Sequence, residues 1–98
     1  MNELKSKIES ILFLQGEPME AVKIAKIVGV KPREVEKALE ELRADWRERG
    51  IILISHTEEW QFATHPKNKA VAEKFFASEF SSELGKSALE ILARRRNQ

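Results

Sequence analysis

The chain has 98 residues and a formal net charge of only +1 at neutral pH. Hydrophobic residues make up 42% and charged residues 34% of it, a balance that indicates one small globular domain. No apolar run approaches the roughly 20 residues that cross a membrane, and the N-terminal MNELKSKIES lacks the apolar stretch of a secretion signal. Cysteine is absent, which excludes disulfides and thiolate metal sites. A cytoplasmic protein is expected.

Two helices are predicted before residue 30. The first covers residues 3–15, where apolar side chains recur at helical spacing, and it stops at Gly16. The second opens at Glu17-Pro18, because proline is tolerated in a first helical turn. It ends at Gly29, which we expect in the left-handed conformation that glycine adopts at little cost.

A third helix is predicted from Pro32 to about Arg49, with Gly50 as its stop. Apolar residues repeat along it at steps of four, three and four and form one narrow seam. The residues of this seam are Val35, Leu39, Leu42 and Trp46. We expect the seam to be buried against the first two helices.

After Gly50 the chain changes to residues typical of β-strands. Residues 51–54 are predicted as one strand, 57–59 as the turn and 60–64 as the returning strand. Another helix follows from Pro66, with apolar pairs spaced one turn apart. The order helix–turn–helix–hairpin predicts a mainly α fold with a small β-hairpin, the winged helix-turn-helix. The expected organisation is a winged-helix domain over 1–76, a Ser- and Gly-containing linker over 77–86 and an isolated helix over 87–98.

Residues for catalysis or cofactor binding are few. The two histidines, His56 and His65, are expected at opposite ends of the hairpin, so they are not predicted to share a metal ion. Asp45 is the only aspartate and is expected to form a surface salt bridge rather than to belong to a catalytic triad. The four glycines each fall at the end of an element and form no phosphate-binding loop. No catalytic, cofactor or metal site is therefore predicted.

The third helix would be the recognition helix of a DNA-binding winged helix. Its outward charges are Arg33, Glu36, Lys37, Glu40, Glu41, Arg47 and Glu48, three positive against four negative. Carboxylates on a helix that enters a DNA groove are repelled by the phosphates. The pattern favours a solvated helix with i,i+4 ion pairs over direct, sequence-specific DNA reading.

Several apolar features exceed what one small core readily covers: the arc of residues 11–14, the strand 51–54 and the helix 88–92. The strand is apolar on both faces, so it needs a second cover. Either a later helix of the same chain or another chain could supply that cover. The interface candidates are Phe13, Ile52, Ile54, Trp60 and Phe80.

The order of segments resembles the segregation and condensation protein B family. IESILFLQGEPM resembles the family's first helix and turn, and VGVKPREVEKALEELRADWRERGI its second and third helices. WQFATHPKNKAVAEKFF is similar to the second wing strand and fourth helix, and LGKSALEILA to the opening helix of a second winged helix. Family members continue into a complete second winged helix. This sequence ends shortly after the first helix of that second domain begins, so we expect it to be either truncated or an unusually short member.

The resemblance implies a non-catalytic architectural subunit of an SMC–kleisin chromosome condensation and segregation complex. Such a subunit binds the kleisin, contacts the SMC ATPase through it, forms a homodimer through its N-terminal domain and associates with the nucleoid. The alternative of the same fold is a winged-helix DNA-binding transcriptional regulator.

Overall fold

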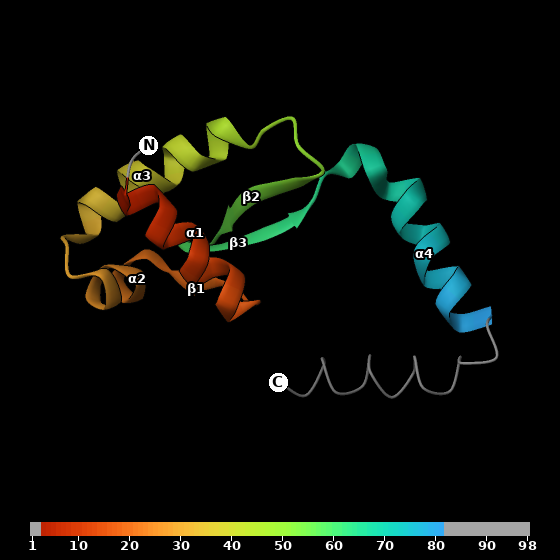
Figure 1. Cartoon of the computed structure of the whole chain (residues 1–98), viewed down its shortest axis with the longest axis horizontal. Helices are drawn as coiled ribbons and strands as arrows, with labels where there is room; N and C mark the ends of the chain where they lie inside the picture. The colour runs from red at the N-terminus through yellow and green to blue at the C-terminus, as the bar shows by residue number, and fades with distance from the viewer. Residues whose placement is uncertain (1–2, 82–98) are drawn as a thin grey trace. The chain divides into compact units, whose positions relative to one another are not determined.

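The computed structural model describes residues 3–81 of the chain. Its elements are α1 (Glu3–Gln15), β1 (Met19–Glu20), α2 (Ala21–Val28), α3 (Pro32–Asp45), β2 (Ile51–His56), β3 (Glu59–Thr64), the short 3-10 helix η1 (Pro66–Asn68) and α4 (Lys69–Ser81) (Figure 1). The chain divides after residue 65 into two compact units. In the first unit, α1, α2 and α3 lie beside a small antiparallel sheet (Figure 1). The predicted fold class, a mainly α winged helix-turn-helix, is confirmed.

The sheet has three strands rather than the two of the predicted hairpin. Their order is β1-β3-β2, so β3 is central and Met19 of β1 lies opposite Trp60 of β3. The short β1 also corrects the start of α2, which begins at Ala21 and not at Glu17-Pro18. Met19 is buried and its backbone pairs with β3, so these residues are extended where a helix was expected.

The core is continuous from the helices to the sheet. Its buried members are Ile8, Leu12, Met19, Ala21, Ile24, Ala25, Val35, Ala38, Leu39, Leu42, Leu53 and Trp60. The predicted α3 seam is confirmed, because Val35, Leu39 and Leu42 are all buried and Trp46 packs against them from the edge. Each helix thus turns one apolar stripe toward the sheet.

Gly29 shapes the tight connection between α2 and α3. Its φ of 85° is left-handed, as predicted. Both the Gly29 and the Val30 N–H groups donate to the carbonyl oxygen of Ala25, at 2.8 and 3.1 Å. This is a Schellman-type cap, and it places Val30 back against the core.

The end of α3 differs from the prediction, because the helix stops at Asp45 and not near Arg49. The N–H groups of Arg47 and Arg49 donate to carbonyls three residues earlier, the spacing of a tight turn and not of an α-helix. This turn follows Trp46, whose ring stacks on that of Phe62. The aromatic contact thus accompanies the change in direction of the chain.

The described part of the second unit consists of η1 and α4. The helix predicted from Pro66 is confirmed as η1 followed by α4, which continues to Ser81. It therefore runs through the first residues of the expected linker 77–86, where the sequence has no glycine or proline before Gly85. The helix predicted over 87–98 lies outside the described residues.

Candidate protein-interaction surface

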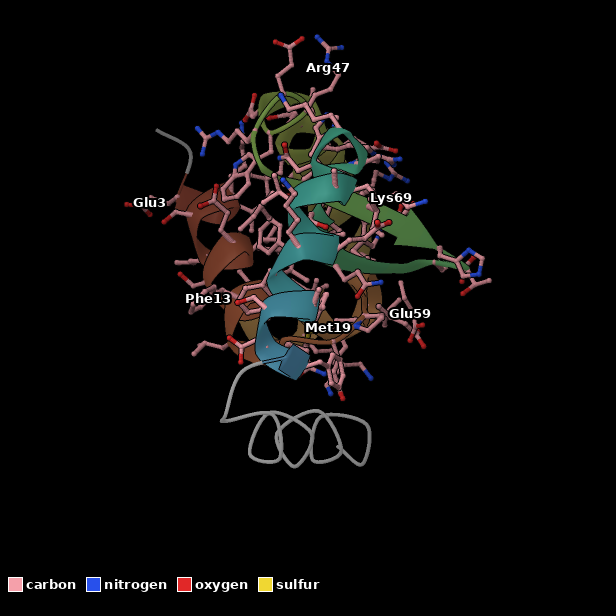
Figure 2. All side chains as sticks on the ribbon, turned by 90° about the vertical axis from the view of Figure 1, so that its right-hand side faces the viewer. Glu3, Phe13, Met19, Arg47, Glu59 and Lys69 are labelled. Carbon is pink, nitrogen blue, oxygen red and sulfur yellow. The ribbon has the colours of Figure 1, made fainter. Side chains whose placement is uncertain are left out.

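The end of α1 exposes two adjacent large apolar residues. Phe13 and Leu14 are 79% and 81% exposed, whereas Ile8 and Leu12 on the inner face of the same helix are buried. Successive helical residues are rotated by about 100°, so residues 13 and 14 leave the face that Leu12 presents to the core. Figure 2 shows Phe13 at the outer side of α1. We call this pair the α1 apolar end.

The helix α4 presents apolar side chains of its own. Val71, Phe75, Phe76 and Phe80 are between 44% and 67% exposed. Val71 and Phe75 are spaced one turn apart, as are Phe76 and Phe80, and the rings of Phe75 and Phe76 meet edge to face at 5.4 Å. Exposed apolar side chains of this size on a helix are typical of a surface that packs against another apolar surface.

The two faces of β2 are unequally covered. Leu53 points into the core, while Ile52 and Ile54 lie on the opposite face and are half-buried. On the neighbouring strand β3, Ala63 lies opposite Ile52 and Gln61 lies opposite Ile54. The predicted apolar character of both faces is present, and Ile52 and Ile54 remain interface candidates.

Trp60 requires a correction, because it was predicted as an interface residue. It is only 7% exposed and belongs to the core, on the same face of the sheet as Leu53. The guanidinium of Arg43 lies over its ring, 4.7 Å from the centroid. A side chain covered by its own domain in this way is not available to a partner.

The interface candidates come from different elements of the structure. Phe13 lies at the end of α1 and Ile52 and Ile54 on the wing, while Phe80 belongs to the second unit. Three exposed apolar residues of α4, namely Val71, Phe75 and Phe76, were not among the candidates, and Leu14 entered only as part of the arc 11–14. The spacing of the apolar pairs in this helix is visible in the sequence and could have identified these three residues as candidates.

The outward face of α3 carries both signs of charge. Lys5 of α1 forms ion pairs with Asp45 and Glu41, and Arg43 pairs with Glu40 at 2.8 Å. The predicted surface salt bridge of Asp45 is confirmed. Hydrogen bonding to Asp45, followed by the attraction of its charge, raises the pKa of Lys5 above its ordinary value. Part of the positive charge in this region is thus neutralised by carboxylates of α3.

The histidines do not form a joint site. His56 lies opposite Glu59 in the β2–β3 ladder, beside the turn, while the His65 N–H donates to the Gly50 carbonyl at the open end of the hairpin. The two histidines thus lie at opposite ends of the hairpin, as expected from the sequence. Within residues 3–81, no group of three His, Asp or Glu residues could hold a metal ion. None of the helices in that range has the length and apolar character needed to cross a membrane.

Comparison with known proteins identifies the family. The profile described as "Segregation and condensation complex subunit ScpB" matches residues 6–94. A segregation and condensation protein B of Clostridium botulinum (strain Kyoto / Type A2) is 34% identical over 94 residues, which are 94% of this chain and 49% of that protein. The corresponding protein of Oceanobacillus iheyensis is 34% identical over 96 residues, 95% of this chain and 50% of that protein. The chain thus spans about half the length of these relatives.

Solved structures show the same similarity. A crystal structure of a dimer of the ScpB N-terminal domain complexed with an ScpA peptide aligns with a TM-score of 0.68 and 30% identity, over 72% of this chain and 91% of that one. ScpB from Mycobacterium tuberculosis aligns with a TM-score of 0.77 and 27% identity, over 93% of this chain and 58% of that one. The profile match covers most of the sequence, and the chain therefore belongs to the segregation and condensation complex subunit ScpB family.

Proposed function

We propose that this chain is the N-terminal winged-helix part of a non-catalytic, architectural subunit of an SMC–kleisin complex that condenses and segregates chromosomes. In this proposal it forms a homodimer, binds the kleisin subunit and reaches the SMC ATPase through it. Its place is the cytoplasm, at the nucleoid. Membership of the ScpB family supports the role, and the related N-terminal domain crystallised as a dimer with an ScpA peptide supports both contacts.

The observation that carries the proposal is the α1 apolar end. Phe13 and Leu14 are almost fully exposed on a domain whose core is complete without them. Two adjacent large apolar side chains in water are costly to leave uncovered, at about 25 cal/mol per Å² of apolar surface. A two-fold contact would bury this pair against a second copy, in an interface on the order of 1,000 Å² or more.

The test is the mass of the chain in solution at high micromolar concentration, by light scattering or sedimentation equilibrium. We expect a dimer for the natural sequence and a shift toward the monomer for the double variant Phe13→Ser/Leu14→Ser. The matched control is Ile27→Ser on α2, since Ile27 is also apolar and 58% exposed but lies on another helix. A monomeric natural chain would contradict the dimer, and equal weakening by the control would contradict this location.

Kleisin binding is tested separately, by calorimetry with the purified kleisin subunit from the same source. A one-to-one ratio of kleisin to chain, or one kleisin to two chains, supports the proposal. Absence of heat and of co-elution with the kleisin, in a chain shown by circular dichroism to be folded, would contradict it.

The alternative function, a DNA-binding transcriptional regulator, is less well supported by α3. On its exposed face, Arg33 and Lys37 are accompanied by five carboxylates, those of Glu34, Glu36, Glu40, Glu41 and Asp45. We expect no tight binding to duplex DNA at about 150 mM salt. Micromolar or tighter binding that is lost in Arg33→Glu/Lys37→Glu would favour the regulator instead.

A further inference from the structure

The strand β2 forms an open edge of the sheet. Within residues 3–81 it pairs with β3 on one side only, because the strand order is β1-β3-β2. An open edge presents unpaired backbone N–H and C=O groups that an extended chain can use. The edge is six residues long, from Ile51 to His56, which matches an ordinary strand.

The hairpin geometry indicates which backbone groups face outward. His56 and Glu59 flank a two-residue turn, so they form a hydrogen-bonded pair. From there along the ladder, non-hydrogen-bonded and hydrogen-bonded pairs alternate. The hydrogen bond from the His65 N–H to the Gly50 carbonyl at the far end agrees with this alternation, because Gly50 and His65 fall at a hydrogen-bonded position. The outward N–H groups are therefore those of Ile51, Leu53 and Ser55, while Ile52, Ile54 and His56 bond to β3.

A groove runs along this edge, between β2 and the C-terminal half of α3. Its volume is about 520 Å³. Glu40, Arg43 and Arg47 contribute to its helix side, and Ile52, Ile54 and Ser55 to its strand side. Basic and apolar groups thus meet beside unpaired backbone.

The groove is electropositive. Arg47 is exposed and forms no ion pair within the described residues, and Figure 2 shows it at the periphery of the molecule. Arg43 pairs with Glu40 through one terminal nitrogen, while its buried Nε has no hydrogen-bond partner within residues 3–81. Two guanidinium groups against one carboxylate leave an excess of positive charge, which suits acidic side chains.

A second copy of β2 is a poor occupant of this groove. Residues 51–56 are IILISH and contain no acidic side chain. Antiparallel pairing of two β2 edges would bring both pairs of arginines together without adding a carboxylate beyond each copy's Glu40. Charge therefore favours a different chain with acidic residues.

We infer that the groove between α3 and β2 binds an extended, acidic segment of a partner protein, which adds to β2 as a fourth strand. Because side chains alternate along a strand, every second residue of the segment points toward α3 and meets Arg43 and Arg47. The residues between them point to the other face and pack beside Ile52 and Ile54. The segment is thus expected to alternate acidic and apolar residues over about six positions.

The inference goes beyond the proposed function, because it assigns a binding mode and a ligand chemistry without depending on dimerisation or on which subunit supplies the segment. The probe is a fluorescein-labelled synthetic peptide of about eight residues in which glutamate and valine alternate. Three comparison peptides are used: one of the same composition with the glutamates in one block, one with lysine for glutamate, and one N-methylated at alternate residues. We expect binding of the alternating peptide only.

Amide hydrogen exchange on the full chain locates the contact. The alternating peptide should slow exchange at Ile51, Leu53 and Ser55, whose N–H groups face outward, and leave Ile52 and Ile54 nearly unchanged. Equal binding of the block or N-methylated peptide would overturn strand addition. Slowed exchange at the same amides without peptide, rising with chain concentration, would show self-association of the edge and also overturn the inference.

Protein variants test the charge. Arg47→Glu should weaken binding of the alternating peptide by about tenfold or more. The matched control is Lys37→Glu, which makes the same change of charge on α3 at an exposed residue outside the groove. Ser55→Pro removes one outward N–H, whereas Ser55→Ala retains it, so only the proline variant should lose affinity. Equal effects of Arg47→Glu and Lys37→Glu would contradict the groove.

Discussion

The indole ring of Trp46 stacks on the phenyl ring of Phe62, with centroids 4.9 Å apart and 25° between the planes. The guanidinium of Arg49 also lies over the indole, 4.6 Å from its centroid. The contact joins the end of α3 to the central strand of the sheet, although both rings are only partly buried. It holds the wing to the helices at the point where the chain leaves α3.

Removal of this contact should destabilise the domain. For Phe62→Ala we expect a loss of about 1–3 kcal/mol in the free energy of unfolding, below the range for a fully buried phenylalanine because Phe62 is half-buried. Urea denaturation followed by circular dichroism measures it. Phe62→Leu, which keeps apolar volume but not stacking, should lose less. An unchanged midpoint for Phe62→Ala would show that the stacked pair contributes nothing.

Leu39 lies at the centre of the core and is fully buried. Leu39→Ala should lower the free energy of unfolding by about 2–5 kcal/mol, through lost transfer energy and the cavity left behind. Phe13→Ala, a similar truncation at an exposed position, should change the stability of the monomer by less than about 0.5 kcal/mol. The pair is compared by urea denaturation at a concentration low enough to exclude association. Similar losses for both would mean that the core is wrongly assigned.

The hairpin turn is occupied by residues poorly suited to it. Thr57 and Glu58 have φ values of 47° and 67°, in the left-handed region that Asn and Gly adopt more readily. The double substitution Thr57→Asn/Glu58→Gly should therefore raise the free energy of unfolding by about 1 kcal/mol. Glu58→Gln keeps the backbone cost and serves as the control, with little expected change. Destabilisation by the double variant would contradict the strain argument.

The ion pair between Lys5 and Asp45 predicts a dependence on alkaline pH. Hydrogen bonding to Asp45 raises the pKa of Lys5 in the folded state. The stabilisation is therefore complete below the unfolded pKa of about 10.4 and is lost as the pH rises through the higher folded value. The stability difference between the natural chain and Asp45→Asn should be constant near neutral pH and shrink above about pH 10. A difference that persists unchanged at higher pH would indicate another role for Asp45.

The sequence predicted the helices better than the transitions between them. Helix α1 has the predicted bounds, and Gly29 ends α2 as expected, because a periodic stripe and a glycine stop are local signals. The strand β1 has only two residues, Met19 and Glu20, so no alternation could reveal it. It forms because β3 offers an edge, which is a tertiary cause.

The candidate surface was predicted less well, as Trp60 shows. Apolar residues of a strand face either the core or a partner, and composition does not decide between them. Along β3, the large rings of Trp60 and Phe62 alternate with Gln61 and Ala63, which could have indicated that the rings lie on the inner face. The register that places Phe62 opposite Leu53 is needed to establish which face is inner. Phe13 is exposed on α1, and its role as a contact remains a prediction.

The pairing of Met19 with Trp60 has a consequence for synthesis of the chain. A nascent polypeptide that has emerged only through α3 contains three helices but neither Leu53 nor Trp60, which close the core from the sheet side. The face of these helices that packs on the sheet then lacks its cover. Domains generally complete folding as units while translation proceeds. For this chain that unit is complete only when β3 has left the ribosome, and until then the apolar face of the helices lacks the cover that Leu53 and Trp60 provide.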